Sequence, residues 1–256
     1  MADMQFIGLE TVDGVARITL TRPKHNVFNI AMMNELSGAL EALAADEGLK
    51  CVVFLAEGPS WCAGVEVADH KPDLAPEMIA TFNRMLAAIE SMPVPTIAAV
   101  QGACLGGGME AAIACDTIIA SDKAKFGQPE IKLGFFPPYA AIRLPRLIGE
   151  AKTIEICTTG RIYRASEAQS LGFIAHVAPE ADFTEFVDRF AKEIQACSPL
   201  IIRLNKQAVR KHLGLAPDQA VATVSDYFLN TLMKTDDVLE GIASFEEKRR
   251  PVWKNK

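Results

Sequence analysis

Three consecutive glycines, residues 106–108, stand directly before Met109 and Glu110. Because glycine has no Cβ atom, a ligand can approach the backbone closely there. The triplet follows a β-branched stretch at 96–100 and precedes a helical pattern. Its N–H groups should therefore point out of a helix N-terminus, where negative charge is favoured. One or two glycines would suffice for a tight turn, and three before an acid indicate a ligand site.

A second acidic residue, Glu130, follows Pro129 in segment 126–134. On its own, Glu130 is most simply the acid at the start of a helix. Paired with Glu110, it could take part in acid–base chemistry. Two carboxylates around one water can act in turn as base and acid, typically for a rate gain of about 10²–10⁴. The linear sequence does not bring the two side chains together, so the pairing is a hypothesis.

A further turn that could present its backbone to a ligand lies in residues 60–67. This segment follows an apolar run at 51–56, and Gly64 gives it local freedom. The N–H of Val65 could then serve as a donor next to this flexible glycine. The alternative interpretation is a loop around a buried Trp61.

The glycine triplet also fits a dinucleotide-binding pattern formally, through Gly106, Gly108 and Ala111. Asp122 even stands at the end of the next predicted strand. However, Glu110 would occupy the first turn of the helix that should receive the pyrophosphate, and its charge would repel that ligand. No βαβ unit precedes the motif either. We therefore disfavour an NAD-dependent enzyme.

Hydrophobic patterns predict the elements that position these residues. Strands are predicted at 15–20, 51–56, 96–100 and 117–120. Helices are predicted after the N-cap Asn29, over 78–89 and over 109–115. Strands that alternate with helices indicate an α/β fold with largely parallel pairing.

After Pro145 the pattern becomes helical. A weak strand signal remains at 174–177, and helical periodicity covers 151–157, 165–171, 183–196, 200–212, 219–233 and 236–249. We therefore expect an α/β core in residues 1–195 and a helical C-terminal region in residues 196–256.

Composition narrows the class of protein. With 32 acidic and 26 basic side chains, the formal net charge of −6 argues against nucleic acid as the main partner, because phosphate binding needs a basic surface. The 6 cysteines form no CxxC pair and the 4 histidines are scattered, so the spacing of metal ligands is absent. The N-terminus resembles no targeting signal, and every apolar stretch is far shorter than the ~20 residues of a membrane span. We expect a cytoplasmic protein with reduced cysteines, no metal, no nucleic-acid partner and no membrane segment.

Several motifs occur in one order along the chain: 20–24 with Asn29 and Met33, 61–65, 106–110, 126–130 and 245–249. On these motifs the chain resembles the enoyl-CoA hydratase/isomerase (crotonase) superfamily over essentially its whole length. The resemblance implies a crotonase-like spiral core of ββα repeats, followed by a C-terminal helical region that forms trimers.

The resemblance also implies roles for the residues singled out above. The backbone N–H groups of Val65 and Gly107 would form an oxyanion hole for the thioester carbonyl. Glu110 and Glu130 would hold the attacking water and deliver the proton. Because isomerases of the superfamily usually keep one such acid, retention of both favours a hydratase.

The same resemblance implies a binding surface for the CoA thioester. It comprises Lys24, Ala63, Val65, Glu66, Val67, Ala68, Gly107, Tyr139, Phe245 and Lys248. Phe245 and Lys248 would come from a neighbouring subunit of a homotrimer or a dimer of trimers. Coenzyme A is then part of the substrate, and no separate cofactor is expected.

The chain departs from ordinary straight-chain hydratases after Gly134, where glycines give way to Pro138, Ala140 and Ala141, and Tyr139 is added. In this segment it resembles the cyclohexa-1,5-diene-1-carbonyl-CoA hydratases, which implies a cyclic dienoyl-CoA substrate in anaerobic aromatic degradation. A straight-chain enoyl-CoA hydratase, an isomerase and a non-catalytic RNA-binding or scaffold relative stay as alternatives. For Tyr139 and His70 we favour a packed aromatic and a surface histidine over roles in the site.

Overall fold

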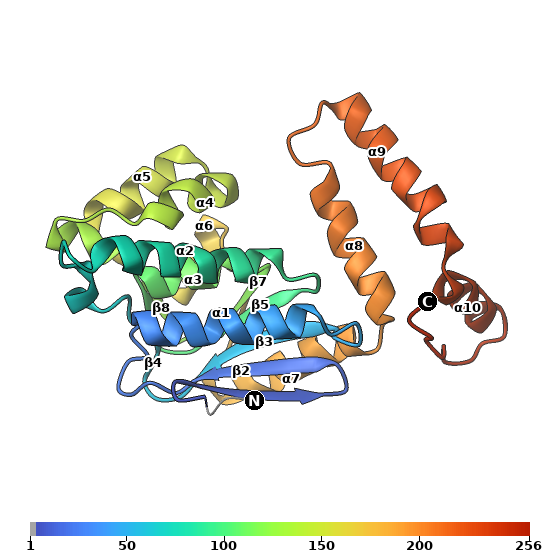
Figure 1. Cartoon of the computed structure of the whole chain (residues 1–256), viewed down its shortest axis with the longest axis horizontal. Coiled ribbons are helices and arrows are strands. Elements are labelled where there is room, and N and C mark those ends of the chain that lie inside the picture. The colour runs from blue at the N-terminus through green and yellow to red at the C-terminus, as the bar shows by residue number, and fades with distance from the viewer. Residues whose placement is uncertain (1–3) are drawn as a thin grey trace.

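The computed structural model describes residues 4–256, and its larger sheet has six strands in the order β1-β2-β3-β5-β7-β10 (Figure 1). The strands are β1 (Ile7–Val12), β2 (Val15–Leu20), β3 (Cys51–Ala56), β5 (Thr96–Val100), β7 (Thr117–Ser121) and β10 (His176–Ala178). β1 and β2 form an antiparallel hairpin, and the other neighbours pair in parallel. The expectation of largely parallel pairing is confirmed.

A smaller sheet has four short strands in the order β4-β6-β8-β9. They are β4 (Ser60–Cys62), β6 (Ala103–Leu105), β8 (Lys125–Gly127) and β9 (Ile162–Arg164). Three times along the chain, a strand of the large sheet is followed by a strand of the small sheet and then by helical structure. This arrangement confirms the α/β class and the ββα repeat that the resemblance implies.

Helices cover the sheets and continue beyond them. The α-helices are α1 (Ile30–Ala44), α2 (Ala75–Ser91), α3 (Gly107–Ala114), α4 (Pro138–Ile148), α5 (Glu150–Thr159), α6 (Ala165–Leu171), α7 (Phe183–Gln195), α8 (Pro199–Lys211), α9 (Pro217–Asn230) and α10 (Asp236–Glu246). Short 3₁₀ helices are η1 (Val67–His70), η2 (Pro129–Leu133), η3 (Glu180–Asp182) and η4 (Leu232–Lys234). The predicted N-cap of α1 is confirmed, since the Asn29 side chain accepts a hydrogen bond from Met32 N.

The central strands of the large sheet are buried on both faces, because their alternate residues enter two separate apolar clusters. Val52 and Phe54 of β3 join the larger cluster with residues of α1, α2 and α3. Cys51 and Val53 join a smaller cluster that α7 covers. A strand buried on both faces has no polar side, which explains the continuous apolar run at 51–56.

Helices α8, α9 and α10 extend away from the sheets, and we call residues 199–246 the arm (Figure 1). The predicted boundary between 195 and 196 falls at the end of α7, and the division into two domains stays a prediction. Large apolar side chains are exposed along the arm: Val209, Leu213, Leu215, Val221, Phe228, Leu229, Met233, Leu239, Ile242 and Phe245. Among the described residues, no helix is long and apolar enough to cross a bilayer.

Several expectations about single elements are corrected. Strand β9 lies in the part expected to be almost purely helical, and like β4, β6 and β8 it is too short to show a period, whereas β10 overlaps the weak strand signal at 174–177. Helix α4 was not expected, and α3 begins at Gly107 instead of Met109. The last helix ends at Glu246, before the expected Arg249, because Lys248 adopts a left-handed φ of 53° that no helix continues.

Gly108 marks the closest approach between α3 and β4. A Cβ atom on Gly108 would lie 2.3 Å from the carbonyl oxygen of Cys62. We therefore expect Gly108→Ala to lower the free energy of unfolding by roughly 1–3 kcal/mol, the usual cost of overpacking. The control is Gly38→Ala in α1, where nothing lies within 4 Å of the Cβ position. Urea unfolding should leave the control unchanged or slightly stabilised, and equal midpoints for both variants would contradict this account.

Candidate active site

A cavity of about 390 Å³ opens between α2, α3, η2 and the start of α4. Its polar lining consists of Glu110, Glu130, His70 and the backbone of Gly64, Val65, Gly106 and Gly107. The rest of the lining is mainly apolar: Ala63, Val67, Ala75, Met78, Ile79, Phe82, Pro129, Leu133, Gly134, Phe135, Phe136 and Pro138. The structure thus brings both acids and both predicted N–H donors to one mostly apolar cavity.

Glu110 lies in the first turn of α3 and is only 2% exposed. Its Oε1 atom accepts hydrogen bonds from the backbone N–H groups of Tyr139 at 2.7 Å and Ala140 at 2.8 Å. These two N–H groups belong to the first turn of α4, where they have no partner within the helix. The positive end of α4 therefore receives the carboxylate, which needs such donors because it is out of water.

Glu130 lies on η2, against the glycine triplet. A Cβ atom on Gly106 would lie 2.8 Å from Glu130 Oε1. The fully buried Gln128, with its amide nitrogen facing these acceptors, lies 3.0 and 3.1 Å from the two carboxylate oxygens of Glu130. In that orientation the amide can donate to both carboxylate oxygens of Glu130. Gln128 was not singled out from the sequence, where its place in the 126–130 motif was the available signal.

Both acids titrate near neutrality. Burial raises the pKa of Glu110 to about 7, and the nearby charge of Glu130 adds to this, whereas the N–H donors of Ala140 and Tyr139 oppose it. Burial raises the pKa of Glu130 to about 7 as well. Around neutral pH the pair can therefore hold one proton between them, which suits a site that needs one base and one acid.

The two predicted N–H donors lie side by side. Gly107 is the first residue of α3, so its N–H has no acceptor within the helix. A Cβ atom on Gly107 would lie 2.5 Å from Val65 Cγ2, which shows how closely the segments meet. Phe28 bonds the residues on either side of Val65, because its N–H donates to Gly64 and its carbonyl accepts from Glu66. Within residues 4–256 neither Val65 N–H nor Gly107 N–H has an acceptor, so both are available to an oxyanion.

Of the predicted CoA-thioester surface, Ala63, Val65, Val67 and Gly107 line the cavity. Glu66 and Ala68 do not, and the Glu66 side chain forms an ion pair with Arg22 at 3.1 Å. Lys24 lines a separate cavity of about 230 Å³ next to Asn26 and Glu57. This part of the predicted surface is therefore split between two hollows.

Three more residues of the predicted surface lie apart from the cavity in one chain. Tyr139 is 8% exposed, so the packed aromatic is the better description, and only its backbone N–H reaches the site. Phe245 is 84% exposed on α10, and Lys248 follows it. Figure 1 shows α10 on the right of the view, beyond α8 and α9, whereas α3 lies within the core on the left. Their part in binding thus requires a second chain and stays a prediction.

His70 is not the surface histidine that we expected. It is half-buried and lines the cavity, with its ring centroid 5.0 Å from that of Phe135. Its Nδ1 lies 2.9 Å from the carbonyl oxygen of Glu66, so Nδ1 carries the proton and the ring is fixed. Phe82 of α2 also lines the cavity, although its helical spacing had indicated only a core position.

The described residues hold no cluster of His, Cys, Asp and Glu side chains that could bind a metal ion. All cysteines are free thiols: Cys51, Cys62, Cys104 and Cys115 are buried, Cys157 is half-buried and Cys197 is exposed.

The raised pKa of Glu110 has a consequence for stability. Because the folded state binds this proton more tightly than the unfolded state, stability is lost as the pH rises from about 4.5 through about 7. Glu110→Gln keeps the oxygen that accepts both N–H bonds and removes the charge. At about pH 8 the free energy of unfolding of this variant should exceed that of the wild type by roughly 1–3 kcal/mol, so the variant is more stable. At about pH 4, where Glu110 of the wild type is protonated, this difference should vanish.

The matched control is Glu193→Gln, an exposed glutamate on α7. Denaturant unfolding at both pH values measures the difference. A Glu110→Gln variant that is less stable than the wild type at about pH 8 would show that burial does not penalise the charged form.

Comparisons with known proteins agree with this geometry. Residues 10–256 match the family described as enoyl-CoA hydratase/isomerase. A cyclohexa-1,5-dienecarbonyl-CoA hydratase of Thauera aromatica is 34% identical over 252 residues, covering 98% of this chain and 96% of the relative. The enoyl-CoA isomerase/hydratase fer4 of Mycosarcoma maydis is 32% identical, with 95% and 93% covered. The crystal structure of an enoyl-CoA hydratase from Bacillus anthracis superposes with a TM-score of 0.93 at 28% identity, with 98% and 100% covered. The chain belongs to the enoyl-CoA hydratase/isomerase family, within the crotonase superfamily.

Proposed function

We propose that this protein is a hydro-lyase that adds water to, or removes it from, the α,β double bond of an acyl-CoA thioester. The observation that carries the proposal is the pair Glu110 and Glu130 in one cavity, beside the free N–H groups of Val65 and Gly107. Hydration needs a base that takes a proton from water and an acid that gives a proton to carbon. An isomerase can instead move one proton between two carbon atoms with a single carboxyl group. Two acids with pKa values near 7 therefore favour hydration over isomerisation.

The geometry supports an order of events. The thioester oxygen accepts from Val65 N–H and Gly107 N–H, which stabilise the negative charge that gathers there as the double bond is attacked. Loss of one such donor typically costs about 10²–10³ in rate. The two N–H bonds on Glu110 favour its ionised form, so we assign Glu110 as the base.

Glu110 takes a proton from water while the water oxygen bonds to the β-carbon. Glu130 gives its proton to the α-carbon, and the pair ends with the proton on the other carboxyl group. Transfer of that proton from Glu110 to Glu130 restores the starting state, so the net change is the addition of one water.

Within this class we propose a cyclic dienoyl-CoA substrate, cyclohexa-1,5-diene-1-carbonyl-CoA, in the degradation of aromatic compounds. The wall beyond the acids carries flat side chains, namely Phe82, Phe135, Phe136 and His70, which suit a planar ring. The 34% identical Thauera aromatica relative bears this name. A straight-chain enoyl-CoA is the alternative, because Phe82, Phe135 and Phe136 would also suit an aliphatic acyl chain.

The proposed partners are the acyl-CoA thioester and further copies of this chain. Coenzyme A enters as part of the substrate, and we propose no separate cofactor. The exposed apolar side chains of the arm support a homotrimer or a dimer of trimers, in which Phe245 and Lys248 would reach a neighbouring cavity. An acidic chain with net charge −6 does not suit the RNA-binding alternative. A cytoplasmic location stays a prediction.

A panel of thioesters tests the reaction. We expect the enzyme to convert cyclohexa-1,5-diene-1-carbonyl-CoA to a product heavier by one water, faster than it converts crotonyl-CoA, as followed by mass spectrometry. Glu110→Gln and Glu130→Gln should each lower kcat by about 10²–10⁴ and leave the Kd for butyryl-CoA nearly unchanged. Glu193→Gln is the control with full activity. Hydration at the normal rate by either site variant would remove that residue from the mechanism, and a preference for crotonyl-CoA would favour the alternative substrate.

Light scattering tests the assembly. We expect a mass of three or six times the 27.7 kDa of one chain. Phe245→Ser should raise the KM for the CoA thioester and leave kcat nearly unchanged, because Phe245 belongs to α10, which Figure 1 shows well apart from the acid-bearing α3 of its own chain. A monomer with full activity would contradict the subunit-shared site.

A further inference from the structure

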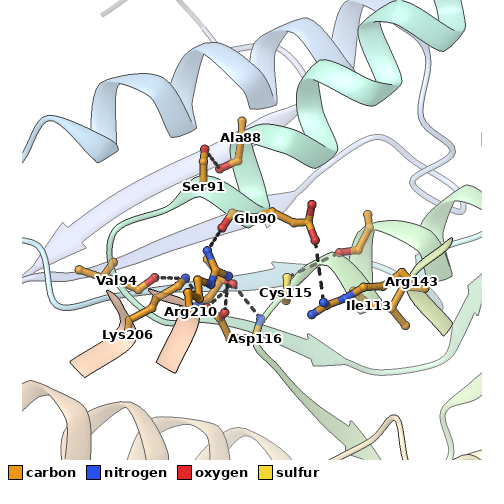
Figure 2. A network of polar contacts seen from close by, with 12 residues as sticks. Ala88, Glu90, Ser91, Val94, Ile113, Cys115, Asp116, Arg143, Lys206 and Arg210 are labelled. Atoms are coloured by element: carbon orange, nitrogen blue, oxygen red, sulfur yellow. Dashed lines mark hydrogen bonds and ion pairs between the residues drawn. The ribbon is translucent and has the colours of Figure 1, made fainter. Parts of the chain in front are cut away.

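Arg143 on α4 lies outside the cavity and joins two neighbouring helix ends. Its Nε donates to the carbonyl oxygen of Ile113 at 3.0 Å, in the last turn of α3. Its guanidinium also lies 4.0 Å from the carboxylate of Glu90, in the last turn of α2. Figure 2 shows these three residues together. Arg143 is thus held in place although its side chain is 24% exposed.

The bond to Ile113 repeats, one turn further on, the bonds that hold Glu110. Glu110 and Ile113 are three residues apart on α3, and Ala140 and Arg143 are three residues apart on α4. The first step of this ladder is Ala140 N–H to the Glu110 carboxylate, and the second is Arg143 Nε to the Ile113 carbonyl. Residues three apart lie on one face of a helix, so both steps connect the same two faces.

We propose that Arg143 is a positioning residue for Glu110, which fixes α4 against α3 so that both N–H donors stay on the carboxylate. This inference rests on the proposed function, in which Glu110 is the base. Arg143 does not line the cavity and acts only through α4.

The N-terminus of α4 has no side-chain cap, and its buried residues Tyr139, Ala140 and Leu144 hold it by apolar packing. Its N-cap residue is Pro137, and Pro138 follows. Pro145 inside the helix has no N–H, so one intrahelical bond is missing. The outer face, with Ile142 and Arg146, is exposed. A short helix of this kind depends on tertiary contacts, and the Arg143 bond is one that crosses to α3 directly.

Glu90 extends the contact to the arm. Its backbone carbonyl accepts a hydrogen bond from Arg210 of α8, and Arg210 also pairs with Asp116 at 2.9 Å (Figure 2). The buried Tyr139 ring belongs to the same region, since burial and the charge of Glu90 raise the pKa of its hydroxyl. The residue that donates its N–H to Glu110 thus packs beside the groups that fix Arg143.

The test compares Arg143→Met with the wild type and with Arg146→Met, an exposed arginine on the same helix. One measurement is the titration of Glu110 by carbon NMR in glutamate-labelled protein, assigned with Glu110→Gln. Because loss of the N–H bonds removes donors that favour the ionised carboxylate, the pKa of Glu110 should rise by roughly one pH unit in Arg143→Met. The other charged or titratable groups facing Glu110 are Glu130 on η2 and Cys157 on α5, and both are unchanged in these variants.

The second measurement is kinetic. We expect kcat to fall roughly 10- to 100-fold in Arg143→Met, as for a misplaced catalytic group, with KM within about threefold of the wild type. Arg143→Lys keeps a positive charge and loses the planar donor, so it should give an intermediate pKa and an intermediate kcat. Arg146→Met should match the wild type in both measurements.

Three results would overturn the proposal. They are an unchanged or lowered Glu110 pKa in Arg143→Met, a rise in KM without a fall in kcat, and wild-type behaviour of Arg143→Lys. If Arg143→Met does not fold, the lysine variant alone decides the question. The titration needs no turnover, so it stands even if no thioester is hydrated, and failure of the proposed function is thereby separated from failure of this inference.

Discussion

The burial of the Glu110 carboxylate at the N-terminus of α4 is the interaction on which the rest of the site depends. A carboxylate out of water is costly unless donors surround it, and a helix N-terminus without a cap leaves N–H groups without acceptors. Here the N–H groups of Tyr139 and Ala140 donate to the Glu110 carboxylate, so the buried charge gains donors and the helix N-terminus gains an acceptor. Burial still outweighs these donors, so the pKa of Glu110 lies near 7, where a group can both take and give a proton.

The glycine triplet follows from the same need for close approach, and each glycine has its own reason. Gly106, with a left-handed φ of 55°, makes room for the Glu130 carboxylate. Gly107 lets the two N–H donors meet, because any side chain there would overlap Val65. Gly108 lets α3 pass against the backbone of β4. The three glycines thus allow Glu130, the N–H donors of Val65 and Gly107, and helix α3 to approach one another closely. A single tight turn would not require all three.

The sequence allowed prediction of those features that repeat or that occur in a compact motif. The long strands and amphipathic helices show a period, and the 106–110 and 126–130 motifs carry both acids. The three-residue strands β4, β6, β8 and β9 could not be predicted, because so short a segment has no period. The position of His70 in the cavity could not be predicted either, because the His70 ring lies beside Phe135, a residue far away in the sequence, and no local pattern indicates such a contact. The predicted part of Phe245 in CoA binding would need a second chain, so the fold of one chain does not test it.

A cluster of polar contacts around Glu90 and Asp116 connects the arm with the helix α4 that holds Glu110. Asp116, just before β7, holds Lys206 and Arg210 of α8, and its carboxylate also accepts from the backbone of Thr96 on β5. Arg210 reaches the end of α2, where the side chain of Glu90 faces Arg143 on α4. Partly buried charges of this kind are stable only when every partner stays in place. A displacement of α8 would therefore disturb both Asp116 and the end of α2, where Glu90 faces Arg143 of the helix that holds Glu110.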